Sequence, residues 1–375
     1  MALVTRLVAI GLLCATWAHA QAPLRVVSGT PVQPIDRNDP LFPQGASGLV
    51  GQLHTITIIT NDEEASVRFY QQAWGLRARG PFTPPAADRA RQNALWGLPT
   101  DERWRLWVLD RPGAPGAAQI RMLAITRPTP HVRSDWTAFE AGPLSIGFAV
   151  PDVHARHKAM LAAGVQPTSQ VNVMALKNST GQPYTVNEGL FKAPDHLLTL
   201  AVGRNGEMSQ IGPFDPATGI GGPTYSGQVI AKSDEVMTFY RDVLGFQVRR
   251  DMEFSSAGEN GGLGLPNGTT FRFLQVFAPG SWTGYLIFLD LRDQGRPAPA
   301  PPRPPQRGLT MWTFVTPDLT ALEQKLRAAK VPIVGGPTEH TSTELGHHRA
   351  LTALAPNGFV LEFVQPLTTP GQGRR

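Results

Sequence analysis

The stretch LHTITIITNDEEASVRFYQQAWGL, residues 53–76, contains the pattern that decides the fold. The alternating apolar residues of LHTITIIT are typical of a half-buried strand, and the spacing of three and four in EEASVRFYQQAW is typical of an amphipathic helix. Gly75 then predicts the end of that helix. The stretch therefore predicts the beginning of a strand-helix unit, and His54 at the start of its strand is a candidate metal ligand.

The same pattern recurs along the chain. SVRFYQQAWGLRARG (66–80) recurs as VMTFYRDVLGFQVRR (236–250) at an offset of 170, and FAVPDVHARHKAMLAAGV (148–165) recurs as FVTPDLTALEQKLRAAKV (314–331) at an offset of 166. Two motifs at nearly the same offset indicate that the two halves are duplicates. Because each motif is followed by several alternating segments, the sequence predicts an α+β fold of four β-α-β-β-β units, two per domain.

Composition marks the predicted segments of the chain. They are a signal peptide (1–20), an irregular arm (21–48), a first domain of two units (49–203), a linker (204–220), a second domain of two units (221–367) and a tail (368–375). Within the second domain, the proline-rich insert 293–308 is predicted to be an extended polyproline segment. Pairing of units one and four in one barrel remains an alternative to pairing of units one and two.

Residues 1–20 are typical of a cleaved secretory signal. Arg6 gives a basic start, residues 7–13 form an apolar run, and Ala18-His19-Ala20 precedes the predicted cleavage before Gln21. The apolar run is well short of the ~20 residues that span a bilayer, and no other stretch approaches that length. We therefore expect a periplasmic or secreted protein that is not inserted in a membrane after cleavage.

Charge and cysteine content exclude several classes of function. The formal net charge is +5 and the charges are scattered, which disfavours a nucleic-acid partner. Cys14 is the only cysteine and lies inside the predicted signal. The mature chain would then have no disulfide, no thiol nucleophile and no thiolate metal ligand.

These motifs resemble those of the vicinal oxygen chelate superfamily, which includes glyoxalase I, extradiol ring-cleaving dioxygenases and bleomycin-resistance proteins. The resemblance rests on residues 53–76, MTFYRDVLGFQV (237–248), the Pro-Asp pairs at 151–152 and 317–318, and APNGFVLEF (355–363). It covers nearly all of the chain from 50 to 367. It implies that paired units curl into two open barrels, each around a cavity. It also implies a divalent metal (Fe, Mn, Ni or Zn) held by a first-strand His and a last-strand Glu.

The family's ligand positions can be placed on this sequence by the resemblance. The first-strand His lies seven residues before the Asp that opens the helix, which puts the position at Thr55 rather than His54. A shift of one residue on a strand turns a side chain to the opposite face, so we expect His54 to face away from the cavity unless a bulge restores it. The same spacing leads to these positions in units two, three and four: Ser145, Tyr225 and Met311.

The closing strands supply the expected carboxylate in one place only. Thr199 or Leu200 stands at that position in the second unit, and Glu362 stands there in the fourth. His54 and Glu362 are thus the candidate metal ligands. A complete set of two histidines and one carboxylate is not visible in the sequence.

Residues 344–354 add candidates for metal-free chemistry. Alternation sends His347 and Arg349 to one face of their strand and His348 to the other. We expect Glu362, one of these histidines and Tyr225 to meet in one barrel, where they could move a proton next to a carbonyl group. Arg349 is an alternative partner for Glu362.

Two functions are open at this point. One is the binding of a small oxygenated or aromatic molecule without a metal, as the likeness to bleomycin-resistance proteins implies. The other is a metal-dependent lyase, isomerase or dioxygenase acting on a small molecule. In either case the expected cavity residues are Thr55, Ser145, Thr199, Met311 and Arg349. Four units in one chain can supply both barrels, so a dimer is not required.

Overall fold

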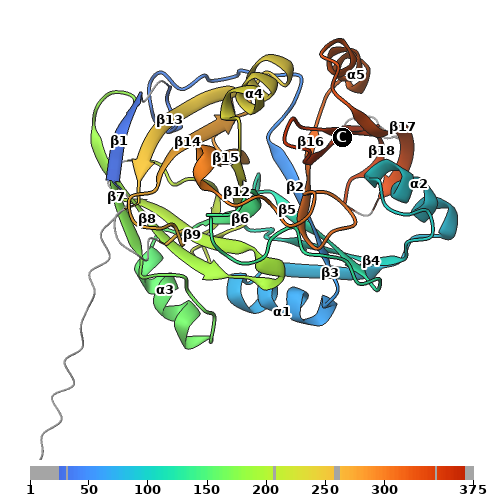
Figure 1. The fold of residues 1–375 in the computed structure, drawn as a ribbon, viewed down its shortest axis with the longest axis horizontal. Coiled ribbons are helices and arrows are strands. Elements are labelled where there is room, and N and C mark those ends of the chain that lie inside the picture. The colour runs from blue at the N-terminus through green and yellow to red at the C-terminus, as the bar shows by residue number, and fades with distance from the viewer. Residues whose placement is uncertain (1–24, 31–32, 206–207, 257–261, 343, 368–375) are drawn as a thin grey trace, which may run out of the picture.

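The structure, a computed structural model, describes residues 25–30, 33–205, 208–256, 262–342 and 344–367. They form two curved sheets that lie side by side (Figure 1). The predicted signal peptide and the tail at 368–375 lie outside the described residues. No helix in the described part of the chain is long and apolar enough to cross a membrane.

The predicted α+β fold with four β-α-β-β-β units is confirmed. Unit 1 has β2 Leu53–Thr60, α1 Glu63–Trp74, β3 Arg77–Phe82, an added α2 Ala86–Trp96, β4 Trp104–Asp110 and β5 Gln119–Ile125. Unit 2 has β6 Gly142–Ala149, α3 Val153–Ala162, β7 Asn172–Lys177, β8 Pro183–Lys192, the 3-10 turn η1 Pro194–His196 and β9 Leu198–Asn205. Unit 3 has β12 Pro223–Ile230, α4 Ser233–Thr238, the π-helix η2 Phe239–Val243, β13 Gln247–Ser255, β14 Thr270–Phe277 and β15 Tyr285–Asp290. Unit 4 has β16 Gly308–Val315, α5 Leu319–Ala328, β17 Ile333–Ser342, β18 Gly346–Leu354 and β19 Val360–Pro366.

Aspartate caps explain where the helix after the first strand begins in three of the four units. The carboxylates of Asp62, Asp152 and Asp318 each accept a hydrogen bond from the backbone N–H three residues later, at 2.9–3.0 Å. Unit 3 has Lys232 at this position, in a left-handed conformation and without a side-chain cap. Its α-helix is shorter and continues as a π-helix.

The sheets combine the units in an order that differs from the chain order. In the nine-stranded sheet, barrel A, unit 2 joins unit 3 through antiparallel pairing of β6 with β12. In the eight-stranded sheet, barrel B, unit 1 joins unit 4 through antiparallel pairing of β2 with β16. The expected pairing of consecutive units within 49–203 and within 221–367 is therefore wrong, and the alternative pairing of units one and four is the one observed.

Two segments outside the units also contain strands. In the predicted irregular arm, β1 Arg25–Thr30 adds a strand to the edge of barrel A by pairing with β13, whereas residues 33–48 have no helix or strand. The predicted linker contains the short hairpin of β10 Phe214–Asp215 and β11 Ile220–Gly221. Both segments thus belong to the folded structure.

Two crossover loops carry the chain between the barrels. Residues 126–141 lead from barrel B to barrel A, and residues 291–307, which include the 3-10 turn η3 Arg292–Gln294 and most of the proline-rich insert, lead back. The loops run together, because Arg296 exchanges backbone hydrogen bonds with Phe139 (2.6 Å) and Ala141 (2.8 Å). The proline-rich insert, predicted to be an extended linker, is therefore tied to its neighbouring loop.

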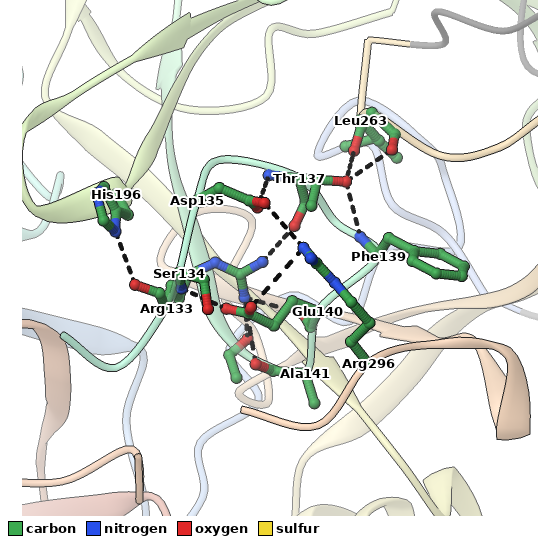
Figure 2. A network of polar contacts seen from close by, with 12 residues as sticks. Arg133, Ser134, Asp135, Thr137, Phe139, Glu140, Ala141, His196, Leu263 and Arg296 are labelled. Atoms are coloured by element: carbon green, nitrogen blue, oxygen red, sulfur yellow. Dashed lines mark hydrogen bonds and ion pairs between the residues drawn. The ribbon is translucent and has the colours of Figure 1, made fainter. Parts of the chain in front are cut away.

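A buried arginine shapes the first of these loops. In Figure 2 the guanidinium of Arg133 lies inside the loop, where it donates to the backbone oxygens of Thr137 and Glu140. From the second loop, Arg296 forms an ion pair of 2.8 Å with Asp135. These contacts fix the two crossovers to each other.

The hydrophobic core has three parts. One cluster lies between the barrels, where Trp74 of α1 stacks on Phe148 of β6 with ring centroids 4.0 Å apart. The other two clusters lie inside barrel A and inside barrel B. Each barrel interior can therefore be considered as a separate candidate site.

We predict that residues 49–203 expressed alone do not form a folded monomer, because each of their two units lacks its partner across the β2–β16 or β6–β12 seam. The full chain should show cooperative thermal unfolding by circular dichroism, whereas the fragment should not. Gel filtration gives the state of association. A monomeric fragment with a cooperative transition would contradict the observed pairing.

Candidate functional site

The unit pairing separates the predicted site residues into two groups. Barrel B contains these: His54, Thr55, Met311, His347, His348, Arg349 and Glu362. Barrel A contains Ser145, Thr199 and Tyr225. The expected group of Glu362, a histidine and Tyr225 in one barrel is therefore wrong, because β12 and β19 belong to different sheets.

Glu362 is fully buried inside barrel B, and its carboxylate is surrounded by hydrogen-bond donors. It accepts hydrogen bonds from Trp96 Nε1 at 2.7 Å, Thr313 Oγ1 at 2.6 Å and Arg121 Nη1 at 2.9 Å. Burial alone would raise the pKa of Glu362, but Arg121 and these hydrogen bonds hold that pKa at about 2. The carboxylate is therefore ionised and has a complete set of partners.

Arg121 makes this arrangement a buried network. Its guanidinium also forms an ion pair with Glu344 at 2.7 Å, and it lies 4.9 Å from the ring centroid of Trp96. The predicted alternative partner of Glu362, Arg349, instead lies near Thr320 and Glu339 at the surface. Sequence reasoning missed Arg121 because it comes from β5 of unit 1, on the far side of the β2–β16 seam.

His54 occupies a bulge in β2. Leu53 and Thr55 face two consecutive residues of β16, Phe314 and Thr313, so that His54 is the extra residue. His54 Nδ1 lies 2.8 Å from Thr55 Oγ1, and its pKa is lowered by burial and by the charge of Arg121. A bulge in β2 is the feature that would let His54 face the barrel interior, and this bulge is present. The charges of Arg121, Glu344 and Glu362 act on the His54 ring.

The two neighbouring histidines of β18 lie in different surroundings. His347 is exposed, whereas His348 is buried against His340, with ring centroids 4.2 Å apart. Burial and the neighbouring His348 lower the pKa of His340 to about 4. The His340 ring is therefore packed as a neutral group in the wall of barrel B, beside the His348 ring.

The interior of barrel B does not fit a catalytic divalent metal. The one carboxylate at a family ligand position, Glu362, already has three donors, one of which is a cation. Thr55 and Met311 stand at the family's histidine positions and are themselves fully buried. Over the described ranges, no group of three His, Cys, Asp or Glu side chains has a geometry that could hold a metal ion.

Barrel A encloses a cavity whose walls are mainly apolar and aromatic. The empty space is about 810 Å³, including the part open to solvent. Ser145 and Tyr225 line it, but Thr199 points to the opposite face of β9 and Leu200 takes its place. The Tyr225 ring lies directly over Gly147, where an added Cβ would come within 1.9 Å of it. Burial raises the pKa of Tyr225 well above its usual value, so its phenol stays protonated. Tyr225 therefore lines the cavity and does not serve as an acid or base at neutral pH.

Glu188 of β8 is the cavity's acidic side chain. It borders the cavity and has no hydrogen bond or ion pair with any described residue. Burial raises its pKa to about 7. A carboxyl group in this state can accept or donate a proton at neutral pH.

Other polar groups in the cavity also have unused hydrogen-bonding capacity. Gln275 Oε1, Gln228 Nε2 and Arg204 Nε are buried without a partner among the described residues. Arg250 also lines the cavity and donates to the hydroxyl of Tyr184. Buried polar groups are normally hydrogen-bonded, so a cluster of unpartnered ones indicates a place for a polar ligand or for ordered water.

The sequence contained a signal for these residues. Residues that alternate along a strand share one face, and the inward face of β8 consists of Tyr184, Val186, Glu188 and Leu190. A carboxylate on an otherwise apolar face is unusual. In the same way, Arg204 follows the inward-facing Leu200 and Val202 on β9. Neither Glu188 nor Arg204 stands at one of the family's ligand positions, so the resemblance did not indicate them.

Comparisons with known proteins agree with this fold. Residues 228–363 match the family model of the Glyoxalase/Bleomycin resistance protein/Dioxygenase superfamily. Glyoxalase I from Zea mays is 9% identical with a TM-score of 0.53, over 84% of this chain and 92% of that one. A candidate dioxygenase from Bacillus subtilis subsp. subtilis str. 168 is 13% identical with a TM-score of 0.51, over 86% of each chain. No curated protein sequence matches.

The expected resemblance is therefore confirmed: the chain has the two-barrel, glyoxalase-like fold of the vicinal oxygen chelate superfamily. At these identities the solved structures show the fold alone. The chemistry of this chain must be inferred from its own side chains.

We predict that Glu362→Ala lowers the free energy of unfolding by about 3–5 kcal/mol, because the buried donors of Trp96, Thr313 and Arg121 would all lose their acceptor, even though Arg121 keeps its ion pair with Glu344. Because the folded-state pKa of about 2 lies below the ordinary 4.5, the wild type should lose stability as pH falls from about 4.5 towards 2. The variant should lack that part of the pH dependence. Urea unfolding at pH 7 and pH 3 measures both effects.

The matched control is Glu339→Ala on β17, because the Glu339 side chain is 58% exposed. It should change the free energy of unfolding by less than about 0.5 kcal/mol. A similarly small change for Glu362→Ala would show that the barrel B network is not a stabilising element.

Proposed function

We propose that this protein binds a small oxygenated or aromatic organic molecule in the cavity of barrel A, without a metal. The observation that carries the proposal is Glu188, an unpartnered carboxyl group in an aromatic cavity. Burying such a group without a partner is costly, whereas a ligand that donates a hydrogen bond would offset that cost. Cavities with apolar walls and a few convergent polar groups are typical of small-molecule sites.

The chemistry of the two barrels supports barrel A as the binding site. In barrel B, Arg121, Trp96 and Thr313 already satisfy the central carboxylate. In barrel A, the carboxyl group of Glu188 has no partner, and the side-chain amides of Gln228 and Gln275 can each form a further hydrogen bond. This arrangement favours binding over the alternative of a metal-dependent enzyme.

A metal-independent enzyme is the second candidate, and the pKa of Glu188 favours it. A general base is most effective when its pKa lies near the working pH, and burial puts the pKa of Glu188 at about 7. Proton abstraction next to a carbonyl group, as in an isomerase or lyase, would suit one carboxylate in a cavity with mainly apolar walls. Turnover of a bound compound that is lost in Glu188→Gln would establish this candidate.

We further propose that the protein acts outside the cytoplasm, after removal of residues 1–20 at the Ala20–Gln21 bond. The support is the basic start, apolar run and small-residue ending of that segment. Sequencing the N-terminus of the secreted or periplasmic protein would test this. We expect it to begin at Gln21.

We predict that the full chain binds some small aromatic or dicarbonyl compounds. For ligands that carry a hydroxyl group, Glu188→Gln should weaken binding about tenfold. A hydrogen bond to a charged group contributes roughly 1.5–3 kcal/mol, and 1.4 kcal/mol corresponds to a factor of ten. Thermal-shift screening with phenol, catechol and phenylglyoxal identifies the ligands, and isothermal titration calorimetry then measures their affinity for the wild type and for Glu188→Gln.

Glu362→Gln is the matched control because it alters the buried carboxyl group of the other barrel in the same way. At a temperature where this variant is folded, its affinity for the ligand should equal that of the wild type. If affinity were lost in Glu362→Gln and kept in Glu188→Gln, the site would lie in barrel B. If no compound bound, the proposal would fail.

A further inference from the structure

Two buried arginines in the barrel A cavity come from different units and meet at one tyrosine. Arg204 is the second-to-last residue of β9 of unit 2, and Arg250 lies in β13 of unit 3. Their guanidinium carbons are 6.0 and 5.9 Å from the ring centroid of Tyr184. Both residues line the cavity, and only 6% of Arg204 and 4% of Arg250 is exposed.

Neither arginine has a counter-ion among the residues that the structure describes. Arg204 Nη1 donates to the backbone oxygen of Ser209 at 3.2 Å, and its Nε has no partner. Arg250 donates to the hydroxyl of Tyr184. A buried cation without a counter-ion costs several kcal/mol, and two neighbouring cations also repel each other.

Two nearby carboxylates, those of Asp36 and Glu188, do not fill this role. Asp36 lies beyond Ser209, and its oxygens accept hydrogen bonds from the Ser209 backbone N–H (3.0 Å), the Ser209 hydroxyl and the Asn38 backbone N–H (2.9 Å). Glu188 occupies a diagonal position on the same sheet face, since it pairs with Val202, two residues before Arg204. Glu188 forms no ion pair with either arginine. The cavity therefore has an excess of positive charge at the Tyr184 end.

Aromatic rings also line this cavity. Tyr285 stacks on Phe277 with ring centroids 4.5 Å apart and on Tyr225 at 5.1 Å. The charges of Arg204, Glu188 and Arg250 all act on the Tyr285 hydroxyl, so this ring lies near both the arginines and the carboxyl group of Glu188. A flat aromatic ligand that packs against Tyr285 would reach both the two arginines and Glu188.

We propose that the ligand of barrel A is an aromatic carboxylate, whose carboxylate group is the missing counter-ion of Arg204 and Arg250 and whose ring lies along Tyr285. A hydroxyl group on that ring would donate a hydrogen bond to Glu188. The inference rests on the proposed binding function and adds the charge and shape of the ligand. Two guanidinium groups that line one cavity without a counter-ion are well suited to a carboxylate.

Calorimetric titration of the full chain with 4-hydroxybenzoate, its methyl ester and phenol tests the inference at low chloride concentration. We expect the acid to bind at least tenfold more tightly than the ester, because the two share the ring and the hydroxyl group and differ in charge. This comparison needs no variant. Equal affinities for acid and ester would overturn the inference and leave the proposed function standing, whereas no binding by any of the three would overturn both.

Variants then assign the charge preference to residues. Arg250→Gln and Arg204→Gln should each reduce the ratio of acid to ester affinity at least fivefold while binding of the ester remains. The control Arg349→Gln, on β18 of barrel B, should leave the ratio unchanged. A ratio that stays at its wild-type value in both cavity variants would overturn the assignment, and thermal unfolding verifies that each protein tested is folded.

Discussion

The antiparallel pairing of the first strands, β6 with β12 and β2 with β16, is the constraint on which the rest of the structure depends. Each unit has a curved sheet with one open side, and this seam joins it to a second unit so that the two enclose a common interior. The pairing decides which side chains meet. Because of it, Arg121 reaches Glu362 across 241 residues of sequence, and Arg250 reaches Tyr184 across 66.

The two interiors built in this way have different chemistry. In barrel B, a guanidinium fills the space beside the carboxylate, and the added helix α2 contributes Trp96 as a further donor. A divalent metal would have to displace Arg121 from Glu362 and Glu344, and it would leave a buried cation beside it. In barrel A, the positions of the family's ligands are taken by Ser145, Tyr225 and Leu200, and the polar groups with free capacity lie elsewhere on the wall.

Local patterns in the sequence predicted the units well. The strand-helix patterns predicted the helices that begin after Asp62, Asp152 and Asp318, and the repeats at offsets of 170 and 166 correspond to duplicated units. The pairing of units could not be derived in the same way, since it depends on contacts between strands that are far apart in sequence. This is why Glu362 and Tyr225 were expected in one barrel. The bulge at His54 is a further non-local feature, because the register of β2 is set by its partner β16.

The most direct test of this account is the metal content of the purified protein, measured by inductively coupled plasma mass spectrometry for the wild type and for Glu362→Ala. The account predicts far less than one equivalent of iron, manganese, nickel or zinc per chain in both proteins, because Arg121 occupies the carboxylate that a metal would need. Near-stoichiometric metal in the wild type that is lost in Glu362→Ala would contradict it and would make barrel B a metal centre.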